Sequence, residues 1–163
     1  MKRALRQSMV LLFAALFVAM GLCADATAGT QVTGGFAVSA TSGGSCRFGT
    51  VSDLAFGAYD PLSATDTTGS TTMSFYCTKG QKYNWYITGD RNMTSGEEKL
   101  SFELYSDSAR TQVFPAEKTD GFGGTGADAN TAITQDIYGT IGKGQNVTGG
   151  LTFNADMTAV VEY

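Results

Sequence analysis

The chain has 163 residues, with 11 basic and 15 acidic side chains, a formal charge of −4 and no histidine. The lack of histidine excludes Ser-His-Asp and Cys-His catalysis and the common zinc sites. An acidic chain without a basic cluster is also a poor candidate for binding nucleic acid or an anionic membrane. Abundant glycine with only two prolines is typical of an all-β sandwich of short strands and glycine turns.

The first residues are predicted to be an export signal. Three basic side chains precede an uncharged apolar stretch over residues 9–22, and small residues follow it. This order is typical of a secretory signal peptide, and the stretch is too short for a comfortable transmembrane helix. We predict a signal peptide over residues 1–26, cleaved after Ala26 or Ala28, and an exported protein without membrane insertion.

A run of alternating side chains follows the signal. One face carries Val32, Gly34, Phe36, Val38 and Ala40. A period of two indicates a β-strand with one apolar face. A Ser-Gly-Gly-Ser linker separates this run from the next cysteine, so we predict a loose strand that the chain can lend. Two alternatives stay open: the run folds back onto its own domain, or it is a disordered tail weakened by its glycines.

Only two cysteines, Cys46 and Cys77, follow the signal. An exported protein meets an oxidising compartment, so a disulfide between them is the natural prediction. A metal site would need further ligands, and the chain offers neither histidine nor another cysteine after the signal. We therefore predict a disulfide, with no metal and no cofactor.

The remaining chain alternates between strand patterns and glycine-rich turns. We predict strands, in chain order, over residues 48–56, 71–78, 83–88, 100–104, a shorter one ending at 114, 133–141 and 151–163. The turn at 79–81 is predicted to make its two flanking strands hairpin partners. Residues 89–96 are predicted to be rich in turns, and residues 121–130 a loose glycine loop. About seven strands at this spacing indicate an immunoglobulin-like sandwich over residues 46–163.

The last strand is the most regularly patterned. Its apolar side consists of Leu151, Phe153, Ala155, Met157, Ala159, Val161 and Tyr163. Nothing follows Tyr163 in the sequence to pair with the free edge of this strand. We therefore expect a sandwich that is one strand short.

Several patterns resemble functional motifs without their context. Glu97 and Glu98 are sequence neighbours, so their side chains point apart and a solvated surface is expected instead of an acid–base pair. Residues 121–126 match GxGxxG, but neither the preceding strand nor the following helix of a nucleotide site is predicted. Residues 123–128 resemble a single copy of a calcium-binding repeat, which cannot stack alone. No catalytic residue is predicted, and the protein is not expected to be an enzyme.

A series of short motifs runs through the chain after the signal. They are FGAYDPLSAT at residues 56–65, CTKG at 77–80, MTSG at 93–96, LYSD at 104–107, YGTI at 138–141 and an alternating last strand that ends in tyrosine. In this order they resemble the spore coat protein U domain family. Most members of that family resemble subunits of archaic, Csu-type chaperone–usher pili.

The resemblance implies an incomplete immunoglobulin-like domain that lacks its last strand. In such pili a periplasmic chaperone fills the gap first, and an outer-membrane usher then exchanges it for the N-terminal strand of the next subunit. Residues 27–45 would be the donor-strand segment and its linker, with the donor face at Val32, Gly34, Phe36, Val38 and Ala40. The edge of the acceptor groove would include Met157, Ala159, Val161 and Tyr163.

We therefore expect a non-enzymatic structural subunit of a secreted surface fibre that supports adhesion and biofilm formation. Its expected partners are neighbouring subunits, the periplasmic chaperone and the usher. Its expected location is the cell surface or the extracellular space, reached through the periplasm. The alternative is a self-contained secreted coat protein or adhesin-type binding module.

Overall fold

The structure is a computed structural model that describes residues 32–163. The predicted signal peptide and its cleavage sites lie outside these residues. The chain divides into two units, Met1–Ala40 and Thr41–Tyr163. Within the first unit, residues 32–40 form neither helix nor strand, and Val32, Phe36 and Val38 are 91%, 87% and 84% exposed. The predicted donor strand is thus an extended apolar segment here, and its role stays a prediction.

The second unit consists of nine strands and one short 3-10 helix. In chain order they are β1 (Cys46–Val51), β2 (Thr67–Cys77), β3 (Lys82–Thr88), β4 (Asn92–Ser95), β5 (Glu98–Ser101), β6 (Glu103–Tyr105), η1 (Lys118–Asp120), β7 (Phe122–Thr125), β8 (Ile133–Ile141) and β9 (Thr158–Glu162). Among the described residues no helix is long and apolar enough to cross a membrane.

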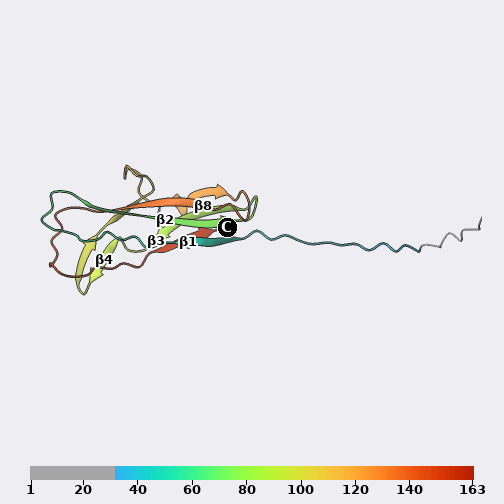
Figure 1. The fold of residues 1–163 in the computed structure, drawn as a ribbon. Helices are drawn as coiled ribbons and strands as arrows, with labels where there is room; N and C mark the ends of the chain where they lie inside the picture. The colour runs from blue at the N-terminus through green and yellow to red at the C-terminus, as the bar shows by residue number, and fades with distance from the viewer. Residues whose placement is uncertain (1–31) are drawn as a thin grey trace, which may run out of the picture. The chain divides into compact units, whose positions relative to one another are not determined.

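The strands form three antiparallel sheets. Their orders are β1-β2-β8-β6, β7-β3-β9 and β4-β5. Figure 1 shows β2 and β8 side by side, and β4 at the end of the unit opposite the C-terminus. The strands β1 and β9 each pair on one side only, so both leave an edge without a partner strand.

Aromatic side chains fill the space between the two larger sheets. The ring of Phe75 on β2 lies 5.0 Å from that of Tyr83 and 5.8 Å from that of Trp85, both on β3. Phe114 packs against Trp85 at 4.8 Å and against Phe122 of β7 at 5.3 Å. Such edge-on contacts are favourable for aromatic rings, and they join the sheets into one core. The buried residues are Phe75, Cys77, Trp85, Ile87, Leu100, Phe102, Leu104, Phe114, Ile137 and Ile141.

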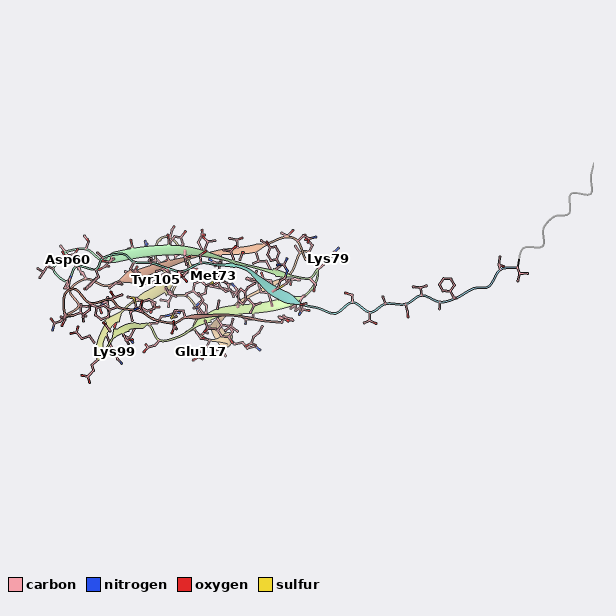
Figure 2. All side chains as sticks on the ribbon, turned by 60° about the horizontal axis from the view of Figure 1, so that its bottom comes forward. Asp60, Met73, Lys79, Lys99, Tyr105 and Glu117 are labelled. Atoms are coloured by element: carbon pink, nitrogen blue, oxygen red, sulfur yellow. A yellow bond between two sulfur atoms is a disulfide. The ribbon has the colours of Figure 1, made fainter. Side chains whose placement is uncertain are left out.

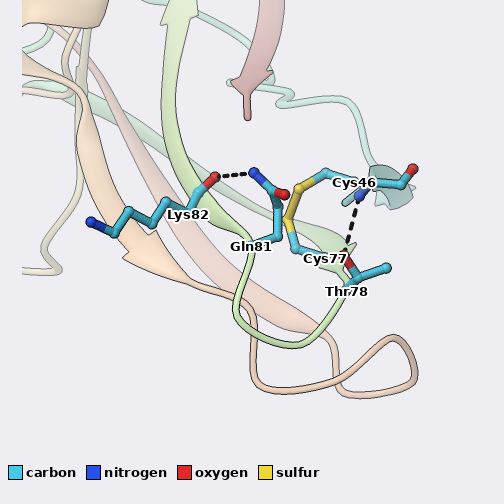
Figure 3. The surroundings of a disulfide bond; sticks show 6 residues. Cys46, Cys77, Thr78, Gln81 and Lys82 are labelled. Atoms are coloured by element: carbon cyan, nitrogen blue, oxygen red, sulfur yellow. Dashed lines mark hydrogen bonds between the residues drawn. A yellow bond between two sulfur atoms is a disulfide. The ribbon is translucent and has the colours of Figure 1, made fainter. Parts of the chain in front are cut away.

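The predicted disulfide between Cys46 and Cys77 is confirmed. It joins the first residue of β1 to the last residue of β2, which are opposite each other in the ladder. The amide of Thr78 donates to the carbonyl of Ser45 at 2.9 Å, and the amide of Ser45 donates to Thr78 Oγ1 at 3.1 Å. Figure 3 shows the bond beside Thr78 and Gln81. The start of β1 is therefore fixed covalently and by hydrogen bonds.

Replacing both Cys46 and Cys77 with serine is expected to lower the free energy of unfolding by about 3–4 kcal/mol, because the bond closes a long loop in the unfolded chain. The two cysteines are 31 residues apart. Urea denaturation of the variant, compared with the unaltered protein with and without reductant, measures this loss. An unchanged urea midpoint in both comparisons would contradict it.

The predicted hairpin of residues 71–78 and 83–88 is wrong. Both strands exist, but β2 pairs with β1 and β8 whereas β3 pairs with β7 and β9. The turn between them carries the chain from one sheet to the other, with the amide of Gln81 bonded to the carbonyl of Thr78. This crossing lets Phe75 and Trp85 face each other across the core, which a flat hairpin would not allow.

The predicted glycine loop over residues 121–130 is also partly wrong, because it contains β7. Phe122 packs on Trp85 and Phe114, and this contact aligns the segment with β3. A Cβ on Gly124 would lie 2.3 Å from the Tyr83 hydroxyl, so any other residue at that position would displace the Tyr83 ring. The glycines here permit close pairing instead of making a loose loop.

Other predicted strands have different ends or divide. The alternating set at 100–104 divides at Phe102, with β5 in one sheet and β6 in another, and the predicted turn region 89–96 contains β4. Residues 133–141 are confirmed as β8. The strands predicted at 48–56 and 151–163 are shorter than expected, ending at Val51 and beginning at Thr158. Most of the predicted strand residues that are not in β1 or β9 line a groove in this unit.

Candidate functional site

An open groove with a mixed apolar and polar lining lies in the second unit, where two chain segments leave the sheets. It consists of two adjoining hollows of about 520 and 480 Å³. One wall comes from residues 51–59, which begin at the last residue of β1, and the other from residues 147–157, which precede β9. Core side chains reach its floor: Ile87, Leu100, Phe102, Leu104, Ile137 and Ile141. We call this feature the acceptor groove, after its proposed role.

Beyond Val51, the first wall is held mainly by side-chain packing instead of strand pairing. Leu54 and Phe56 lie over two glycines, Gly69 of β2 and Gly139 of β8. A Cβ on Gly139 would lie 2.6 Å from the Phe56 ring, and one on Gly69 would lie 2.8 Å from the carbonyl oxygen of Ala55. Because these positions lack side chains, the wall can lie close to the sheet, where the Thr71 hydroxyl of β2 donates to the carbonyl of Ser52 at 3.0 Å.

The second wall is bound to the β4–β5 sheet. The amide of Thr94 donates to the carbonyl of Asn154 at 2.8 Å, and the amide of Asn154 donates back at 3.1 Å. The side chain of Gln145 bonds both the amide and the carbonyl of Ser101 at 2.7 Å. Residues 147–157 are thereby positioned with apolar side chains toward the groove although they form no regular strand.

Tyr59 connects the first wall to the segment that precedes the second wall, at one end of the groove. Its hydroxyl accepts from the amide of Gln145 at 2.8 Å and donates to the carbonyl of Gly142 at 3.2 Å. Figure 2 places Asp60, the next residue, and Lys79 at opposite ends of the unit. The Tyr59 end of the groove is therefore the end remote from the turn that follows the disulfide.

Arg91 lies beside the groove at its second wall. Its Nε lies 3.4 Å from the carboxylate of Glu103, and its Nη2 donates to the carbonyl of Ile87 at 3.3 Å. Its Nη1 lies 4.0 Å from the sulfur of Met157. Burial lowers the pKa of Arg91, and the charge of Glu103 opposes that shift. The guanidinium is thus a charged donor beside the groove, in contact with the sulfur of Met157.

Only part of the predicted groove edge lines the groove. Met157 is a lining residue. Ala159 and Val161 are half-buried on β9 opposite Ile87 and Trp85, and Tyr163 is 62% exposed. The role of these four as an acceptor edge stays a prediction. Sequence reasoning missed the other wall, although the alternation of Leu54 and Phe56 was visible.

Glu98 fixes the second wall through Thr148. Its carboxylate accepts from the amide of Thr148 at 2.7 Å and from the Thr148 hydroxyl. These bonds, first the one from the hydroxyl, lower the pKa of Glu98 below its ordinary value of 4.5. A lowered pKa in the folded state means that the bond stabilises above the ordinary pKa, and that this contribution is lost as pH falls through the folded value.

We therefore expect the amide resonance of Thr148 to titrate with a midpoint below 4.5, the ordinary pKa of this carboxyl group. Titration by NMR measures this midpoint, and the Glu98→Gln variant should show no such transition. A midpoint at or above the ordinary value, or the same transition in the variant, would contradict the assignment.

Within residues 32–163, no three His, Cys, Asp or Glu side chains lie close enough together to hold a metal ion.

The family model described as the Spore Coat Protein U domain matches residues 32–153. The chain belongs to the spore coat protein U domain family. Its matched part includes the exposed segment 32–40 and almost the whole acceptor groove, and β9 follows it.

The comparison with solved structures bears on the fold alone. Thirteen chains match. One belongs to the crystal structure of the CsuC–CsuE chaperone–tip adhesion subunit pre-assembly complex from archaic chaperone–usher Csu pili of Acinetobacter baumannii. It has a TM-score of 0.52 and 16% identity, and the match covers 74% of this chain and 40% of that one. The predicted immunoglobulin-like sandwich is confirmed. A search of curated proteins found no match.

Proposed function

We propose that this chain is a structural subunit of a chaperone–usher pilus, joined to its neighbours by donor-strand insertion. The acceptor groove carries this proposal, because its two adjoining hollows reach down to buried side chains of the core. The occupant is residues 32–40 of a second copy. That segment presents Val32, Phe36 and Val38 on one face and exposes all three.

The groove offers an inserted strand both apolar contacts and backbone partners. Burying each large side chain of the segment stabilises the complex by roughly 1.5–3 kcal/mol. The strands β1 and β9 each have a free edge, and an extended segment can add to such an edge by main-chain hydrogen bonds. Met157, Ala159, Val161 and Tyr163 would follow the inserted strand along one side.

The same exposed groove explains the need for helper proteins. A free sheet edge beside an apolar hollow is an aggregation hazard. We infer that a periplasmic chaperone covers it before assembly, and that an outer-membrane usher exchanges the chaperone for the next subunit. The product would be a surface fibre that supports adhesion and biofilm formation. No enzymatic role, cofactor or nucleic-acid partner is proposed.

Deletion of residues 30–42 tests this function. The mature chain should form heat-resistant polymers, whereas the deleted chain should stay monomeric and gain thermal stability from a synthetic peptide of residues 30–42. Size-exclusion chromatography and thermal melts measure both. Normal fibres from the chain that lacks residues 30–42 would contradict the proposal. If both proteins are equally stable monomers, the chain is instead a self-contained secreted coat or adhesin-type module.

A further inference from the structure

Three methionines surround one part of the acceptor groove. Met73 of β2, Met93 of β4 and Met157 before β9 all line the 480 Å³ hollow. No other methionine occurs in residues 32–163. Each is half-buried, so solvent reaches them through the open groove. The thioethers of the domain are thus gathered where a second copy would insert its strand.

The side chain of Met157 packs against Gly89 and lies beside the charged guanidinium of Arg91. A Cβ on Gly89 would lie 2.7 Å from the Met157 sulfur, and Gly89 has a φ of 137°. Glycine is the residue that adopts this conformation readily and leaves the space that the thioether occupies. The guanidinium of Arg91 lies on the same sulfur at 4.0 Å. An oxygen added to this sulfur would have Arg91 within reach as a hydrogen-bond donor.

We propose that Met73, Met93 and Met157 form an oxidation site that controls strand insertion. The proposal rests on the proposed function of the groove. Peroxide reaching an empty groove converts the thioethers to sulfoxides, and the oxidised groove no longer accepts a donor strand. An occupied groove is covered, so assembled subunits are protected. The site therefore acts on free subunits and spares the finished fibre.

The chemistry balances with hydrogen peroxide as the oxidant. The thioether sulfur attacks one peroxide oxygen, the O–O bond breaks, an S–O bond forms, and water leaves after proton transfer. Sulfur loses two electrons and the peroxide gains them. The flexible apolar side chain becomes a polar one, and methionine sulfoxide reductases reverse the change.

The sulfoxide oxygen lowers the affinity for an inserted strand more than it lowers the stability of the domain. In the open groove each sulfoxide keeps its contact with water, and that of Met157 can accept from Arg91. An inserted apolar strand would remove the water, and a buried polar group without a partner is costly. We expect roughly ten- to a hundredfold weaker strand binding per sulfoxide left unpaired.

A full mature chain that carries Phe36→Asp tests the site, because its groove is intact and its own donor segment is disabled. A fluorescent peptide of residues 30–42 is titrated into this chain before and after treatment with hydrogen peroxide, and mass spectrometry locates the sulfoxides. Oxidation should weaken peptide binding, and sulfoxide reductase should restore it. The chain with Met73→Leu, Met93→Leu and Met157→Leu should bind the peptide equally well with or without peroxide.

The possible outcomes distinguish a failure of the oxidation site from a failure of the proposed function of the groove. A peptide that does not bind the untreated chain overturns the proposed function. A peptide that binds equally well after all three sulfoxides have formed overturns the oxidation site alone, as do methionines in the empty groove that resist peroxide. If the triple leucine variant does not fold, the reductase reversal in the parent chain decides the question.

Discussion

A Phe36→Asp chain is expected to stay monomeric at concentrations where the unaltered chain polymerises. Phe36 is 87% exposed, so the change should leave the melting temperature of the monomer unaltered. In the acceptor groove, however, the aspartate would lose the burial of the ring, worth about 1.5–3 kcal/mol. It would also place a carboxylate without a partner in an apolar site, which costs more. Insertion should weaken at least roughly a hundredfold.

Two matched variants isolate the cause. Ser39→Asp puts the same charge on the opposite face of the segment, and Phe36→Leu keeps an apolar side chain at the same position. Both should still polymerise, as measured by light scattering and by heat-resistant ladders on gels. Polymerisation of Phe36→Asp at the normal rate, or its failure in Ser39→Asp as well, would show that Phe36 is not an inserting residue.

Phe75→Ala is expected to lower the free energy of unfolding by about 3–5 kcal/mol, since it removes a large ring from the centre of the core. Phe75 is 2% exposed and contacts the rings of Phe48, Tyr83 and Trp85. A domain is commonly stable by only about 5–15 kcal/mol, so this single change removes a large part of the total. Urea denaturation followed by Trp85 fluorescence and circular dichroism measures it.

Phe48→Ala is the control for Phe75. Phe48 lies on the edge strand β1 and is 39% exposed, and its ring centre lies 6.5 Å from that of Phe75. Its loss should cost less than half as much because the site is already open to water. Equal losses in the two variants would mean that Phe75 contributes no more to stability than the partly exposed Phe48 does.

The fold class was predictable because alternation reports which side of a strand is buried. Ile133–Ile141 and the strand that begins near Tyr83 follow from that pattern directly. The partner of each strand did not follow from it. The alternating patterns around Phe75 and Trp85 fit a hairpin as well as they fit two facing sheets. Only the packing of the two rings across the core determines which arrangement forms. The strand at Phe122 was hidden by glycines whose purpose is close packing.

The site was predictable only in part. Residues 51–59 and 151–157 alternate like strands because they turn apolar side chains toward the groove. Strand structure also needs a hydrogen-bonded neighbour, and periodicity says nothing about a neighbour that is missing. The sequence therefore shows which faces are apolar, including that of Met157. It does not show that a groove lies between them. The gathering of Met73 and Met93 beside Met157 depends on three distant segments, and no local pattern reports it.

The position of the disulfide has a mechanical consequence. An edge strand pulled from its first residue comes away one hydrogen bond at a time, and β1 pairs with β2 alone. Tension entering through the residues before Cys46 instead meets a covalent bond at once and passes to β2. That strand is bound along its length to β8, from Thr67 to Phe75. In a stretched fibre the sheet would be loaded in shear through the inner strand β2. After reduction of the disulfide, β1 should peel away from β2 at a lower force, which a single-molecule pulling experiment measures.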